Sequence, residues 1–182
     1  MAKQYSALSE PLLAFIAAHV FFVGTATANS RVNVSPKGMD SLRVLSNNRL
    51  IWLNLTGSDN ETSAHVQHNP RMTLMFCAFE GAPLILRLYG AARVIHQNDP
   101  EWQALLVHFN PLPGARQIFD LAIDLVQTSC GMGVPYLSTA GERPMLAEWA
   151  IKKGDAGLRQ YWEDINQLSI DNIPTHIIEK NI

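Results

Sequence analysis

A polar segment in the middle of the chain carries residue types that can hold an anion. It follows the apolar run 50–53, and six of its seven residues from Asn54 to Asn60 favour loops, helix caps or turns. Residues 62–66 can then form one or two helical turns, which must stop at Asn69 because a residue before proline avoids the helical region. Free backbone N–H groups at the start of such a helix, together with hydroxyl side chains, suit a phosphate group. A capped turn without a ligand uses the same residue types and is the alternative interpretation.

The remaining reactive side chains form no recognisable catalytic or metal-binding pattern. Cys77 and Cys130 are far apart in the sequence, and His65 and His68 have a spacing that suits a metal but no evident third ligand. A nucleophile, a base and an orienting group cannot be identified together, so a hydrolase is not supported. We therefore expect no metal site and assign no catalytic residue.

The composition is that of an ordinary globular protein. Of 182 residues, 47% are hydrophobic and 16% are charged, which is enough apolar material for one domain spanning residues 1–182. The net charge of -2 gives no basic surface for general nucleic-acid binding. No apolar run reaches the ~20 residues of a membrane-spanning helix, and the apolar stretch 12–23 lacks the basic flank of a signal peptide. We expect a cytoplasmic protein that binds neither nucleic acid nor membrane.

Alternating and β-branched segments predict a mainly β fold with flanking helices. Pro36 to Gly38 is expected to break one strand, and Gly90 to mark a bend or a close approach of two backbones. Antiparallel strands in this number favour a small closed barrel, because closure leaves no exposed edges. Strands are expected at 21–27, 31–35, 42–45, 50–55, 72–79, 84–95 and 123–128, and helices at 9–19, 99–109, 143–152 and 157–168.

Three short motifs, taken in their order along the chain, resemble one known family. They are Ser-Pro-Lys-Gly at 35–38, Gly-Ser-Asp-Asn-Glu-Thr at 57–62 and Cys-Gly-Met-Gly-Val-Pro at 130–135. Over about residues 12–136 the chain resembles the pyridoxamine 5'-phosphate oxidase-like family of FMN-binding split-barrel proteins, in a branch distinct from the oxidase itself. The resemblance implies a six-stranded antiparallel Greek-key split β-barrel. It also implies a homodimer with cofactor sites at the interface, and an FMN-dependent oxidoreductase acting on a small-molecule substrate.

The resemblance also implies which residues bind the cofactor. Lys37 matches the family lysine at the end of the phosphate-side strand, and Asn54 and Leu55 fall where the family strand lines the flavin ring. The full set of expected cofactor-binding residues is Ser35, Lys37, Asn54, Leu55, Thr56, Asn60, Glu61, Thr62 and Ser63.

The chain departs from the oxidase at three places where the oxidase has cationic or polar contacts. Residues 60–63 stand in place of a phosphate-binding Arg-Lys pair, Val32 in place of a basic residue, and an apolar residue near Ile85 in place of a glutamine. One lysine, hydroxyl groups and helix N–H groups would then have to hold the phosphate, with Glu61 as a like charge. The oxidase substrate is therefore not carried over. A non-catalytic flavin carrier or sensor, or a split barrel that uses haem or a deazaflavin, are the alternatives.

Overall fold

The computed structural model describes residues 2–17 and 20–182. Its eight strands are β1 (Lys3–Tyr5), β2 (Phe21–Thr25), β3 (Asn33–Lys37), β4 (Leu42–Ser46), β5 (Arg49–Leu55), β6 (Arg71–Cys77), β7 (Ile85–His96) and β8 (Ala115–Ser129). Its helices are α1 (Glu10–Ala17), α2 (Glu61–His68), α3 (Trp102–Leu106), α4 (Met145–Ile165) and α5 (Ile177–Asn181). The predicted helix 9–19 is therefore found as far as Ala17, and His19 lies outside the described residues. The short strand β1 and the helix α5 were not predicted.

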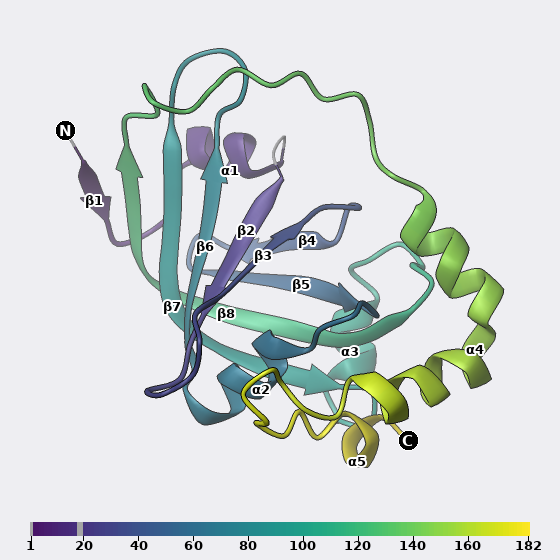
Figure 1. Cartoon of the computed structure of the whole chain (residues 1–182). Coiled ribbons are helices and arrows are strands. Elements are labelled where there is room, and N and C mark those ends of the chain that lie inside the picture. Colours follow the sequence, from purple (N-terminus) through teal and green to yellow (C-terminus); the bar gives the residue numbers. More distant parts are fainter. Residues whose placement is uncertain (1, 18–19) are drawn as a thin grey trace.

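All strand pairs are antiparallel, and the sheet curls into a barrel that stays open on one side (Figure 1). The strand order is β3-β2-β6-β7-β8-β5-β4, with β1 added to β8. No ladder joins the two end strands β3 and β4 within the described part of the chain. This confirms the predicted split barrel, but with eight strands instead of six.

The sheet buries apolar side chains on both of its faces. In β5, Leu50 and Trp52 belong to the cluster inside the barrel, while Ile51 and Leu53 belong to a second cluster covered by α3. The ring of Trp52 stacks on Phe119 of β8 with centroids 4.4 Å apart. Burial on both faces holds the strands that carry the central polar segment in fixed positions.

Two sequence expectations about strand limits are wrong. Pro36 and Lys37 do not break a strand but complete β3, which pairs with β2 on one side only. Proline is tolerated there because an edge strand does not need every N–H group for pairing. The strand β8 begins at Ala115, well before the predicted residue 123.

Gly90 lies where the backbones of β7 and β8 come close together. A register shift falls between Tyr89 and Gly90, and a Cβ atom at Gly90 would lie 2.0 Å from the carbonyl oxygen of Ala122. The expected close backbone approach is confirmed, since no side chain fits in that distance.

The C-terminal part of the chain wraps back over the barrel opening (Figure 1). An extended segment leads from β8 to α4, which is kinked at Gly154, in agreement with the two helices predicted at 143–152 and 157–168. Residues 166–176 then lie against α2, where the N–H of Ile170 donates to Glu61 at 2.8 Å. Among the described residues, no helix combines the length and the hydrophobicity needed to cross a bilayer.

Candidate functional site

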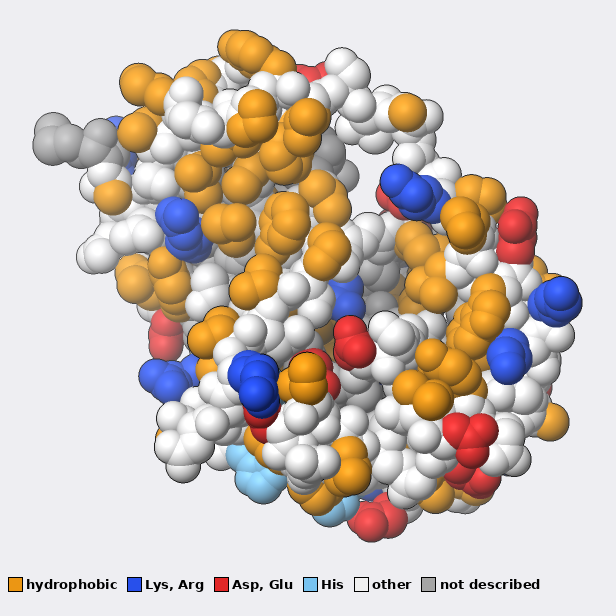
Figure 2. Space-filling view, in the orientation of Figure 1, with side chains coloured by type: hydrophobic (Ala, Val, Ile, Leu, Met, Phe, Trp, Pro, Cys, Tyr) orange, Lys and Arg blue, Asp and Glu red, His pale blue; other side chains and the backbone are white. Residues whose placement is uncertain are grey.

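Two adjoining cavities lie at the open side of the barrel, near the hollow visible in Figure 2. The smaller one, about 390 Å³, is called here the polar cleft. It is lined by β3, the turn 38–41, the end of β5, the loop 57–60, the start of α2, Arg116 and Leu146. The larger one, about 770 Å³, is called the apolar cavity, and it shares Gly38, Met39 and Ser41 with the cleft. Both volumes fall in the range of small-molecule sites.

Most of the residues expected to bind a cofactor line the polar cleft together. These are Ser35, Lys37, Asn54, Leu55, Asn60, Glu61 and Thr62. They come from β3, β5 and α2, which are separated in sequence but adjacent at the barrel opening. Several are fastened to one another: the Asn33 amide donates to Thr62 Oγ1 at 3.2 Å, and Ser35 Oγ donates to Asn33 Oδ1 at 3.1 Å.

Thr56 and Ser63 are placed behind the wall of the cleft instead of in it. The hydroxyl of Thr56 donates to the carbonyl of Gly114 at 2.8 Å and accepts from Trp162 Nε1 at 2.9 Å. Ser63 is fully buried, and its hydroxyl accepts from the amide of Gln117 at 3.0 Å. These two side chains hold β5, α2 and β8 together and do not face a ligand.

Lys37 projects from β3 into the cleft. The alternation of β3 turns Asn33, Ser35 and Lys37 inward and leaves Val32 and Val34 exposed. Burial lowers the pKa of the Lys37 ammonium from 10.5 to about 8; Arg116 lowers it further and Asp59 opposes the change. Within the described residues, this ammonium has no hydrogen bond or ion pair. It is a largely buried cation without a direct ion pair, and Asp59 is the nearby negative charge that acts on it.

Arg116 is a second cation in the cleft, and it was missed by the sequence analysis. It stands at the start of β8, is 2% exposed, and donates to Asn166 Oδ1 at 2.7 Å and to the carbonyl of Asp59. Its Nε has no partner, and no described carboxylate forms an ion pair with it. Burial lowers its pKa to about 9, opposed by Asp59 and Tyr161, so the guanidinium is charged at neutral pH.

Two carboxylates also line the cleft, and they are held differently. Glu61, expected to repel an anion, accepts the N–H of Ile170 with one oxygen, while the other lies 3.9 Å from Nε2 of His65. Asp59 is exposed, and its negative charge raises the pKa values of Lys37 and Arg116. One oxygen of Glu61 is thus engaged outside the cleft, and the other has no hydrogen-bond partner among the described residues, whereas Asp59 competes with an anion for the two cations.

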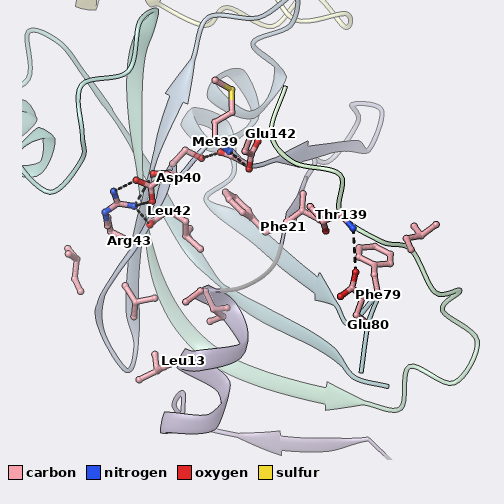
Figure 3. A pocket seen from close by; sticks show the side chains of 18 of the residues that line it. Leu13, Phe21, Met39, Asp40, Leu42, Arg43, Phe79, Glu80, Thr139 and Glu142 are labelled. Carbon is pink, nitrogen blue, oxygen red and sulfur yellow. Dashed lines mark hydrogen bonds and ion pairs between the residues drawn. The ribbon is translucent and has the colours of Figure 1, made fainter. Parts of the chain in front are cut away.

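The apolar cavity is closed along one side by the extended segment that follows β8 (Figure 3). Glu142 accepts the N–H of Met39 at 3.3 Å, and the N–H of Thr139 donates to Glu80 at 3.4 Å. Beside them Arg43 pairs with Asp40 at 2.8 Å. Aliphatic and aromatic side chains such as Leu13 and Phe21 form much of the remaining wall. The cavity can therefore take a largely apolar group next to the polar cleft.

Solved structures of other proteins share this fold. A candidate pyridoxamine 5'-phosphate oxidase from Lactobacillus delbrueckii superposes with a TM-score of 0.55 at 22% identity, covering 67% of this chain and 94% of that one. HupZ of Group A Streptococcus superposes with a TM-score of 0.52 at 16% identity, covering 65% of this chain and 91% of that one. At these identities the likeness concerns the fold alone.

Sequence comparison identifies the family. The chain is 37% identical over 175 residues to the pyridoxamine 5'-phosphate oxidase family protein ustO of Aspergillus flavus, covering 85% of this chain and 70% of that protein. The family model described as pyridoxamine 5'-phosphate oxidase matches residues 8–130, which include β3, β5, α2 and Arg116. The chain therefore belongs to the pyridoxamine 5'-phosphate oxidase family.

Proposed function

We propose that this protein binds FMN and uses it as an oxidoreductase, with the FMN phosphate held in the polar cleft by Lys37 and Arg116. The observation that carries the proposal is this pair of cations in one cleft, neither of which forms a direct ion pair with a described carboxylate. A buried charge without a direct partner is costly, and an anionic ligand would supply that partner. Charge-assisted hydrogen bonds from the lysine and the arginine compensate for the missing Arg-Lys pair of the oxidase.

The remaining residues of the cleft fit an anion with an attached polar chain. Ser35 and Thr62 line the same cleft as Lys37 with hydroxyl groups, and Asn60 has a buried Oδ1 without a partner, which can accept only from a hydroxyl of the attached chain. The N–H groups of the first turn of α2 add the positive end of a helix. An aromatic ring attached to the phosphate-bearing chain can extend past Gly38 and Met39 into the apolar cavity.

A bound flavin would supply the redox chemistry, which is transfer of a hydride or of electrons to or from a substrate. The protein residues bind the phosphate, orient the ring and exclude water. We assign no acid–base residue, because this division of roles does not require one. The substrate is proposed to be a small molecule that enters the apolar cavity. We further propose that the active form is a homodimer whose second chain completes this open side.

The binding proposal is tested by comparing FMN with riboflavin, which lacks the phosphate, in titrations with the purified protein. FMN is expected to bind at least about tenfold more tightly than riboflavin, the worth of one or two charge-assisted hydrogen bonds. Lys37→Ala should remove most of this difference. Asp59→Asn should increase it, because the competing carboxylate is gone. Arg71→Ala, on an exposed arginine outside both cavities, is the matched control.

Two results would contradict the proposal in different ways. Equal affinity for FMN and riboflavin in the wild type would show that the cleft does not hold the phosphate. If FMN binds tightly but is not reduced by a nicotinamide cofactor or another donor, the protein is a flavin carrier or sensor and not an oxidoreductase. Retention of FMN after desalting, and bleaching of its absorption on reduction, measure the two steps separately.

A further inference from the structure

Asn166 lies directly behind the polar cleft, at the end of α4. It is fully buried. Its Oδ1 accepts from Arg116 Nη1 at 2.7 Å, and its Nδ2 donates to the carbonyls of Gly57 and Ser58 at 3.1 and 3.2 Å. One amide group therefore joins the arginine of the cleft to the loop that forms its rim.

The backbone of the same residue extends the connection. Its carbonyl accepts from Asn60 Nδ2 at 3.4 Å and from Thr175 Oγ1 at 2.6 Å. Asn60 is the last residue of the rim loop, and Thr175 precedes α5. The position of the loop 57–60 is thus tied to the C-terminal segment, which lies beyond the residues 8–130 matched by the family model.

The chemical type of this side chain matters for the charge of the cleft. An amide oxygen accepts a hydrogen bond from a guanidinium without neutralising it, whereas a carboxylate in the same place would form a buried ion pair. The amide nitrogen also needs acceptors, and the two loop carbonyls supply them. Asparagine meets both requirements at once, whereas aspartate would accept from Arg116 but would neutralise it and would have no N–H to donate to the loop carbonyls.

Resting on the proposed function, we propose that Asn166 is a positioning residue for the phosphate: its neutral amide fixes Arg116 and the loop 57–60 while leaving the positive charge of Arg116 free for the ligand. The C-terminal segment then contributes to anion binding by positioning Arg116 and the loop 57–60, although no atom of Asn166 lines the cleft. A merely structural role and a positioning role make different predictions for two substitutions at this residue.

The decisive experiment compares Asn166→Asp with Asn166→Ala in the full-length protein. Affinities for FMN and riboflavin are measured by titration, and the melting temperature is measured without ligand. The aspartate should keep more stability than the alanine, because it still accepts from Arg116. The aspartate variant should nevertheless lose more of the preference for FMN over riboflavin than the alanine variant does. The expected loss is about tenfold, because the carboxylate neutralises the arginine. Asn98→Asp, at an exposed asparagine away from both cavities, should change neither quantity.

The opposite orders of stability and preference are what the proposal requires. If both variants lose stability and FMN preference in the same order, or if the aspartate keeps the wild-type preference, Asn166 has only a structural role. If the aspartate variant does not fold, Asn166→Ser replaces it, since its shorter, neutral side chain cannot reach Arg116 and both loop carbonyls at once. An intermediate loss of preference then supports the proposal, and an unchanged preference overturns it.

The experiment separates this inference from the flavin proposal. If the wild type binds neither flavin, the proposed function fails, and inorganic phosphate becomes the probe. A rise in melting temperature with phosphate that is present in the wild type and absent in Asn166→Asp would still support the positioning role. No effect of phosphate on the wild type would overturn it.

Discussion

At the scale of single residues, Lys37 determines how anion binding should depend on pH. Its pKa of about 8 lies below the usual 10.5 because the ammonium is buried next to Arg116. In the ligand-free protein, this group therefore lowers stability below pH 8, and stability recovers as pH rises from 8 toward 10.5. A bound phosphate acts in the opposite direction on the pKa of Lys37, because it stabilises the charged ammonium.

FMN affinity is accordingly expected to fall by up to about tenfold between pH 7 and pH 9 as Lys37 loses its proton. The phosphate itself stays a dianion over this range, since its second pKa is about 6. Titrations at several pH values measure the effect, with riboflavin as the ligand that should show no slope. In Lys37→Met the dependence of FMN affinity on pH should disappear. If it persists in this variant, a group other than Lys37 causes it.

The sequence could reveal Lys37 but not Arg116, and the reason is physical. Lys37 precedes a glycine at the end of a strand, within a motif that resembles the family. Arg116 stands beside Gln117 in a segment where both faces of the strand are buried, so the apolar residues fit either a helical or a strand period. An arginine at the start of a largely apolar segment was the available signal.

At the scale of the elements, the sequence located nearly every helix and strand but misjudged strand limits. The end of β3 was taken as a break because of Pro36, yet an edge strand tolerates proline. The polar segment from Asn54 to Asn60 was placed correctly between a strand and a helix. Its attachment to Asn166 could not be predicted, since it depends on a contact across more than a hundred residues.

The pairing of β7 with β8 gives a prediction about Gly90. Gly90→Ala should destabilise the protein by at least about 3 kcal/mol, because the new methyl group cannot fit against the Ala122 carbonyl without moving a backbone. Urea unfolding of the ligand-free protein measures the change. Gly133→Ala is the matched control, since no atom lies within 4 Å of its added Cβ. A loss in Gly90→Ala no larger than in this control would mean that β7 and β8 can separate at little cost.

At the scale of the whole molecule, β3 has an unusual distribution of side chains. Its polar residues face the cleft, while Val32 before it and Val34 within it are 73% and 63% exposed. Exposed apolar side chains on an edge strand would favour aggregation unless another surface covers them. A second copy of the chain is the proposed cover, because β3 also lines the polar cleft in which we propose that the cofactor binds.

The mass in solution tests this arrangement. Light scattering coupled to size-exclusion chromatography should give twice the mass of the chain for the wild type. Val32→Glu combined with Val34→Glu should shift it toward the single-chain mass, because two carboxylates would have to be buried at the interface. Val107→Glu is the control. This valine is 78% exposed and follows α3, which covers the second apolar cluster, so its substitution should leave the dimer intact. A wild type of single-chain mass would overturn the proposed homodimer.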